Sequence, residues 1–105
     1  MLPALLEQID ELLAEPAEEP ASLARLERTL TDGYAYALEL ESERWRLEQR
    51  MSELTSELAE GDQELKATEL ALLSDRLAKN ASTLSGLRGT LTRLRAHTSA
   101  TRSGL

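Results

Sequence analysis

Leucines and other apolar residues recur along most of this chain at alternating steps of three and four residues, which is the spacing of one face of an α-helix. One series consists of Leu23, Leu26, Leu30, Gly33, Ala37, Leu40, Arg44, Leu47, Met51, Leu54 and Leu58. A second series consists of Leu70, Leu73, Leu77, Asn80, Leu84, Leu87, Leu91 and Leu94. We call the two series together the seam. They predict two long helices, over residues 23–60 and 63–98.

A shorter apolar stripe precedes them and predicts a helix over residues 3–14. Two prolines end this helix within the acidic stretch 15–22, which we expect to be a short stiff linker. The apolar pattern fades at Thr98, so residues 99–105 are expected to be a frayed tail. The chain is expected to be a single helical domain.

The two long helices are predicted to fold back on each other about Gly61 and Asp62, because glycine suits the end of one helix and aspartate caps the start of the next. One antiparallel register brings the leucines of the two series level with each other. It also brings level their two polar members, Arg44 and Asn80. We interpret this pair as a polar layer that fixes the register, with a ligand-binding or catalytic pair as the alternative.

The predicted fold is therefore all-α: an antiparallel helical hairpin, or coiled coil, with a short N-terminal accessory helix. Gly33 lies inside the first arm, and the spacing of the seam passes through it without a shift. A helix that ended at Gly33 would have no reason to keep that spacing, so we expect a continuous helix. Gly33 and Ala37 then make a thin place in the seam, where backbones approach closely or a side chain inserts, opposite Leu87 and Leu91.

All three aromatic residues lie in this same arm. Tyr34, Leu38 and Trp45 share one side of the predicted helix outside the seam, which we call the aromatic flank, and Tyr36 lies on the opposite side. A two-helix hairpin leaves such a flank open to water, so a cover is expected, either the N-terminal helix or another chain. These four residues are the candidate partner-binding surface, with core of a third helix or of a dimer as the alternative interpretation.

The N-terminal helix spans only about 20 Å and leaves most of a long hairpin uncovered. We therefore expect a homodimer of hairpins that forms a larger helical bundle. The composition agrees with helices, since the chain has no valine and no phenylalanine and has a single isoleucine, Ile9. It also lacks cysteine, which excludes a disulfide framework. Charges recur throughout, so no membrane span is expected and the cytoplasm is the expected location.

The formal charge of −7 is unevenly distributed. Residues 1–60 hold fifteen acidic residues and five arginines, whereas residues 61–105 hold four acidic and seven basic residues. In a hairpin the two excesses lie side by side and offset each other. The alternative is a nucleic-acid-associated protein that uses the basic C-terminal arm, namely Arg88, Arg93, Arg95 and Arg102. That arm lacks the interleaved aromatic residues on which single-strand binders stack bases.

Residues for catalysis are scarce. The single histidine, His97, is expected to be an exposed residue near a fraying end. Without cysteine, it cannot complete a zinc site of the usual kinds. Four acidic residues near the turn are expected to form a solvated tip rather than a Mg²⁺ site. We expect no catalytic residue, cofactor, metal or small-molecule substrate, and predict a non-enzymatic coiled-coil module for protein–protein interaction or scaffolding.

Overall fold

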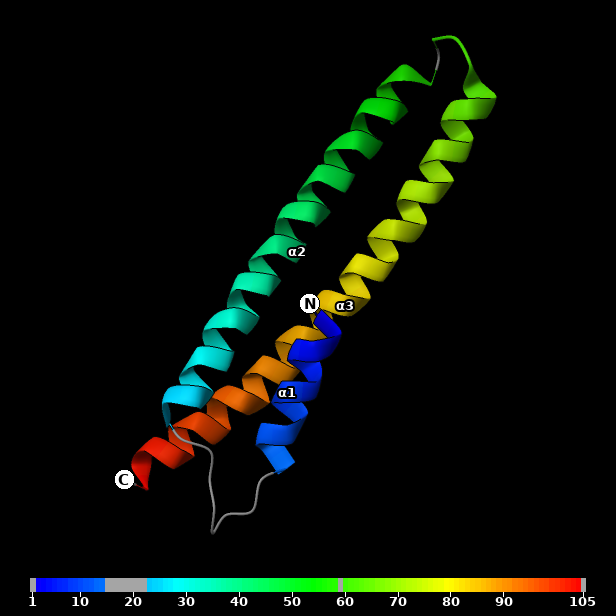
Figure 1. Ribbon diagram of the computed structural model, residues 1–105. Coiled ribbons are helices and arrows are strands. Elements are labelled where there is room, and N and C mark those ends of the chain that lie inside the picture. Colours follow the sequence, from blue (N-terminus) through cyan, green and yellow to red (C-terminus); the bar gives the residue numbers. More distant parts are fainter. Residues whose placement is uncertain (1, 15–22, 59, 105) are drawn as a thin grey trace. The chain divides into compact units, whose positions relative to one another are not determined.

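A computed structural model of the chain describes residues 2–14, 23–58 and 60–104 (Figure 1). The predicted linker, residues 15–22, lies outside the described residues. Within the described ranges the structure is helical and contains no strand. The prediction of an all-α chain is confirmed.

The chain forms three helices, α1 (Leu2–Ala14), α2 (Leu23–Glu57) and α3 (Gln63–Ser103). The first two helices lie within a few residues of their predicted bounds. The third helix is longer than predicted, because it continues five residues beyond residue 98. Thr98 is buried and its Oγ1 donates to the carbonyl oxygen of Leu94 at 2.8 Å. Arg102, further along α3, pairs with Glu27 of α2, so a contact of the folded chain holds the segment that was expected to fray.

The contacts divide the chain into two compact units. Unit 1 consists of Met1–Leu38 and Ser85–Leu105, and unit 2 consists of Glu39–Leu84. Helix α1 belongs to unit 1 alone. The first part of α2 and the last part of α3 complete unit 1, and the remaining parts of these two helices make unit 2.

Unit 1 has a core to which all three helices contribute. Leu5, Ile9 and Leu12 fall four and three residues apart on α1, and all three are buried. This spacing gives α1 one apolar face, and its burial is what holds so short a helix, since isolated helices of this length are marginal in water. Gln8 Nε2 donates to Thr29 Oγ1 on α2 at 3.2 Å, which adds a polar contact beside the apolar ones.

Helix α2 is continuous through Gly33, so the glycine does not end the first arm. Gly33 is buried, and a Cβ atom added there would clash with Cδ2 of Leu91 on α3. Leu91 itself is 1% exposed. The absence of a side chain at residue 33 therefore makes room for a core leucine of unit 1.

Unit 2 is a two-helix hairpin. Its core consists of the buried residues Leu47, Leu54 and Leu73, and three partly buried residues pack against them: Met51, Leu70 and Leu77. These residues belong to the predicted seam. Because only two helices contribute, part of this apolar surface stays accessible to water.

The turn of unit 2 lies at Gly61, which has a φ of 81°, in the left-handed region that glycine adopts at little cost. Asp62 precedes the first residue of α3, and its Oδ1 accepts a hydrogen bond from the backbone N–H of Leu65 at 3.2 Å. That bond satisfies one of the free N–H groups at the helix start. Lys66 Nζ donates to the carbonyl oxygens of Glu57, at 2.7 Å, and of Glu60, which ties the end of α2 to the turn.

Among the described residues, no helix combines the length and the apolar character that crossing a membrane requires.

Candidate functional site

The aromatic flank is exposed in the structure. Within unit 1, Tyr34 is 47% exposed and Leu38 is 65% exposed. Helix α1 lies on a different side of α2, where Leu5 and Gln8 share a cleft of about 250 Å³ with Tyr36. The N-terminal helix was one of the two expected covers for the flank, and it instead lies beside the tyrosine that the sequence places opposite the flank.

Unit 2 exposes three further large apolar side chains. Trp45, the third residue of the aromatic flank, is 61% exposed on α2. Leu65 and Leu72 on α3 are 67% and 62% exposed. The predicted sites include neither leucine, although a signal was present: the two leucines lie seven residues apart and outside the seam.

The two polar members of the seam, both in unit 2, have different partners. Asn80 is 5% exposed, and its Nδ2 donates to the carbonyl oxygen of Leu40 on α2 at 3.0 Å. Its Oδ1 is buried without a hydrogen-bond partner. Arg44 is exposed, and its Nε donates to Oε1 of Glu48, one turn further along α2, at 2.9 Å. The Asn80 side chain therefore links the two helices through a backbone carbonyl, and the Arg44 side chain reaches outward.

A groove of about 720 Å³ runs along unit 2 between α2 and α3. We call it the unit 2 groove. Its apolar lining includes Leu40, Leu47 and Leu73, and Asn80 and Thr83 also line it. Its charged lining residues are Glu43, Arg46, Arg50, Glu69, Arg76 and Lys79. The groove thus combines apolar residues from the core of unit 2 with a charged rim in which cations outnumber anions.

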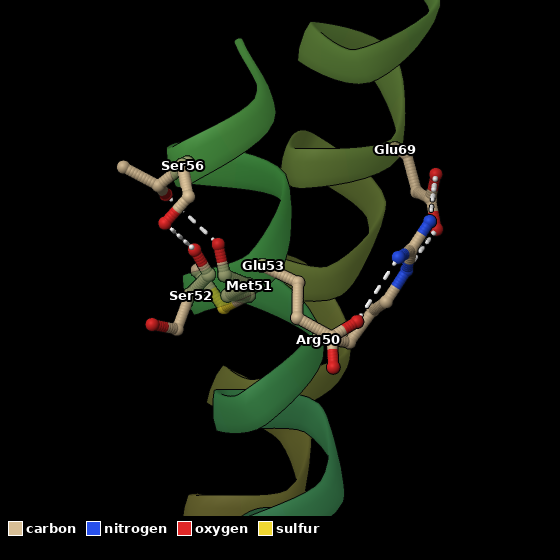
Figure 2. Close-up of polar contacts among 7 residues, drawn as sticks. Arg50, Met51, Ser52, Glu53, Ser56 and Glu69 are labelled. Carbon is tan, nitrogen blue, oxygen red and sulfur yellow. Dashed lines mark hydrogen bonds and ion pairs between the residues drawn. The ribbon is translucent and has the colours of Figure 1, made fainter.

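Arg50 crosses from α2 to α3 at this groove (Figure 2). Its Nε and Nη2 donate to the two carboxylate oxygens of Glu69 at 3.0 and 3.3 Å. Its Nη1 donates to Oε2 of Glu53 at 3.2 Å. The hydrogen bond to Glu69, followed by that to Glu53, raises the pKa of the Arg50 guanidinium above its ordinary value. This bidentate pair joins the helices of unit 2 by side chains as well as by their core.

The basic residues near the chain's end make contacts within unit 1. Arg102 Nη2 forms an ion pair with Glu27 Oε1, and Arg93 Nη2 donates to Thr90 Oγ1 at 3.3 Å. The Glu27 contact is of the kind expected if the acidic and basic regions offset each other within the molecule. His97 was expected to be exposed, and this is wrong: it is half-buried, with a buried Nε2 that has no hydrogen-bond partner, because α3 stays packed beyond it.

Among the described residues, side chains that could hold a metal ion do not converge. In the part of the chain that the structure describes, no group of three or more histidine, cysteine, aspartate or glutamate residues is placed to do so. The chemistry that the described surface offers is therefore that of exposed apolar side chains and of a charged groove.

Comparison of the chain with protein-family models, with curated proteins and with solved structures finds no match.

Proposed function

We propose that this protein is a non-enzymatic helical interaction module whose aromatic flank is an interface, where it associates with a second copy as a coiled-coil homodimer or binds a partner protein. The observation that carries the proposal is the exposure of Leu38 and Trp45, at 65% and 61%, in a chain whose own accessory helix lies elsewhere. Single exposed apolar residues are ordinary on protein surfaces. Here they recur at helical spacing on one side of α2, which is the pattern of a helix that receives another helix.

The type of residue also favours an interface. Tryptophan and tyrosine are enriched among the side chains that contribute most to binding, because they bury a large area and lose few rotamers. This chain holds only three aromatic residues, and all three lie in α2 between residues 34 and 45. The composition, which lacks cysteine, is compatible with action in the cytoplasm, where thiols are kept reduced.

Self-association can be tested by size exclusion coupled to light scattering over a range of protein concentrations. We expect a dimer mass that falls toward the monomer on dilution. Trp45 is the only tryptophan, so its emission should shift to the red over the same range as the indole becomes hydrated. A mass that stays monomeric at every concentration, with emission of a hydrated indole throughout, would contradict the dimer.

A matched pair of variants tests whether the aromatic flank is the interface. Leu38→Glu places a charge in the flank, and Leu65→Glu places the same charge at an equally exposed leucine outside it. We expect Leu38→Glu to weaken the dimer by roughly tenfold or more, since a buried unpaired carboxylate is costly, and Leu65→Glu to leave it nearly unchanged. Equal effects of the two variants would contradict the proposal that the aromatic flank lies in the dimer interface.

The alternative function, nucleic-acid association, has less support. Arg93 and Arg102, two of the four arginines on which it depends, already bond to side chains of unit 1. Binding to a labelled DNA or RNA duplex that falls steeply with added salt would favour this alternative, because phosphate contacts release counterions.

A further inference from the structure

Helix α1 covers one heptad position of α2 in unit 1. Thr29 receives the hydrogen bond from Gln8 of α1, and Tyr36, seven residues later, shares a cleft with Leu5 of α1. A residue seven positions further along a continuous helix falls at nearly the same angle, since two turns take 7.2 residues. The face of α2 that contains Thr29 and Tyr36 is therefore the face on which a third helix docks in unit 1.

The next two residues at this heptad position are Glu43 and Arg50, in unit 2. Both line the unit 2 groove. On α3 the same step of seven leads from Thr90, which is buried in unit 1, back to Thr83, which lines the groove. The position that α1 covers in unit 1 is thus the position along which unit 2 has an open groove.

The floor of the groove offers apolar contacts for another helix. Leu47 and Leu73 belong to the core of unit 2 and also line the groove. Leu40 also lines it. Met51, Leu70 and Leu77 pack against the same core outside the lining of the groove and stay only partly buried. Unit 2 therefore has two of the helices that unit 1 has, and an incompletely covered core.

The rim of the groove favours an acidic occupant. Of its four cations, Arg50 is paired with Glu69, and Lys79 pairs with the exposed Asp75 at 3.0 Å. Arg46 and Arg76 have no hydrogen bond or ion pair within the described ranges of the chain. The remaining acidic residue of the rim is Glu43. A cationic rim in a chain of net charge −7 is a local exception that complements an anionic partner.

We propose that the unit 2 groove is a docking site for an acidic amphipathic helix of another protein, which lies on unit 2 as α1 lies on unit 1. Helix α1 shows the chemistry required: apolar residues at steps of four and three, and the acidic residues Glu7, Asp10 and Glu11. The apolar face of the chain's own α1 is already buried in unit 1, so a second copy offers no free helix of this kind. The inference rests on the proposed function as an interaction module and adds a second binding surface, separate from the aromatic flank, with the class of partner that it takes.

A synthetic peptide of residues 2–14 is the probe, used with the full-length chain. Because the chain lacks cysteine, Thr83→Cys provides a single attachment point for an environment-sensitive fluorophore in the groove. Ser74→Cys, exposed on the same helix and not among the lining residues, provides the matched control. We expect the peptide to change the emission of the label at residue 83 saturably and to leave the label at residue 74 unchanged.

Two charge tests establish how the peptide binds. Replacing the three acidic residues of the peptide by lysine, or introducing Arg46→Glu together with Arg76→Glu in the chain, should weaken binding roughly tenfold or more. Arg28→Glu together with Arg95→Glu changes the net charge equally at exposed positions of unit 1 and should have little effect. The peptide could instead take the place of α1 in unit 1. Binding there would not depend on Arg46 and Arg76, so the two pairs of variants distinguish it from binding in the groove.

Several results would overturn the inference: no response at residue 83, an equal response at residue 74, or an equal loss in the Arg28/Arg95 control. A second copy in the groove would be recognised by a label at residue 83 that is shielded without peptide and becomes hydrated on dilution. That outcome overturns the inference and supports self-association. Conversely, a monomer that binds the peptide in the groove would contradict the dimer of the proposed function and leave the inference standing.

Discussion

Units 1 and 2 are made largely from the same two helices, yet they bury their side chains to different extents. In unit 1 the core residues Ile9, Leu12, Leu91 and Leu94 are between 0 and 1% exposed, and Leu5 is 8% exposed. In unit 2 the core residues Leu47 and Leu73 are 8 and 7% exposed, Leu54 is 1% exposed, and three neighbouring apolar residues are only partly buried. The difference follows from α1, which contributes to unit 1 alone.

A seam of leucines therefore pairs two helices but does not by itself complete a core. Two helices in contact each leave a wide apolar stripe partly open to water, and a third helix closes it. Two polar links also join the helices of unit 2, the Arg50–Glu69 pair and the bond from Asn80 to a carbonyl oxygen. We expect unit 1 to be the more stable of the two, and four substitutions test this.

The largest effect is expected from Leu12→Ala. Leu12 is fully buried, so the variant should lower the free energy of unfolding of unit 1 by about 3 kcal/mol through lost burial and a cavity. Native-state hydrogen exchange should show protection lost in unit 1 and kept in unit 2. Leu72→Ala, at an exposed leucine, is the control and should change stability by less than about 0.5 kcal/mol. Equal loss of protection in both units would show that they unfold together, which would contradict a difference in stability between them.

Gly33→Ala should also act on unit 1. The added Cβ clashes with the buried Leu91, and overpacking of this kind outweighs the gain in helix propensity, for a net loss of about 1–2 kcal/mol. Urea unfolding measures this change in the free energy of unfolding. Gly86→Ala is the matched control, since nothing lies within 4 Å of a Cβ atom at residue 86, and it should stabilise by up to about 1 kcal/mol. If both variants stabilise the protein equally, the side chain of Leu91 can move aside at little cost, and the core of unit 1 around Gly33 is loosely packed.

Asn80→Leu should stabilise unit 2 by about 1 kcal/mol, because it removes a buried oxygen that has no hydrogen-bond partner. The Leu40 carbonyl oxygen loses its bond to Asn80, but it lies within a helix, where carbonyl oxygens accept backbone hydrogen bonds. Hydrogen exchange should show the gain in unit 2 and narrow the difference between the units. A clear loss of stability would mean that the Asn80–Leu40 bond outweighs the cost of the unpaired oxygen.

The smallest effect is expected from Arg44→Leu. Arg44 is exposed and forms an ion pair with Glu48 along its own helix, so the change in unfolding free energy should stay within about 0.5 kcal/mol. Light scattering should find the same mass as for the unmodified chain. A larger loss, or a change of mass, would favour the interpretation of Arg44 as a residue that fixes the register.

Much of the fold could be predicted from the sequence, because the steps of three and four run through two long stretches without a shift. Even Gly33 could be placed inside a helix, since Leu30 and Ala37 keep the phase on either side of it. The end of α3 could not, because Thr98 counts as polar in any hydropathy pattern although it is buried in the folded chain. Its hydroxyl bonds to the preceding turn and so enters the core without an unpaired donor.

The candidate sites were harder to predict than the helices. The side of α2 on which α1 docks contains Thr29 and Tyr36. Because both side chains carry polar groups, a hydropathy pattern does not mark this side of the helix as one that another helix covers. The Arg50–Glu69 pair depends on two long side chains meeting across helices, which a spacing within one helix does not indicate. Leu65 and Leu72, in contrast, could have been recognised as exposed because they lie outside the seam.

The division of the chain also has a consequence for the order of folding. Unit 2 is one contiguous stretch, Glu39–Leu84, bent at Gly61, whereas unit 1 joins segments from opposite ends of the sequence. Contacts between neighbouring segments close short loops and form quickly, and contacts between distant segments must wait for a larger loss of chain entropy. We therefore expect unit 2, whose core is less completely buried, to form first and nucleate folding. Unit 1, whose core is better packed, should assemble last.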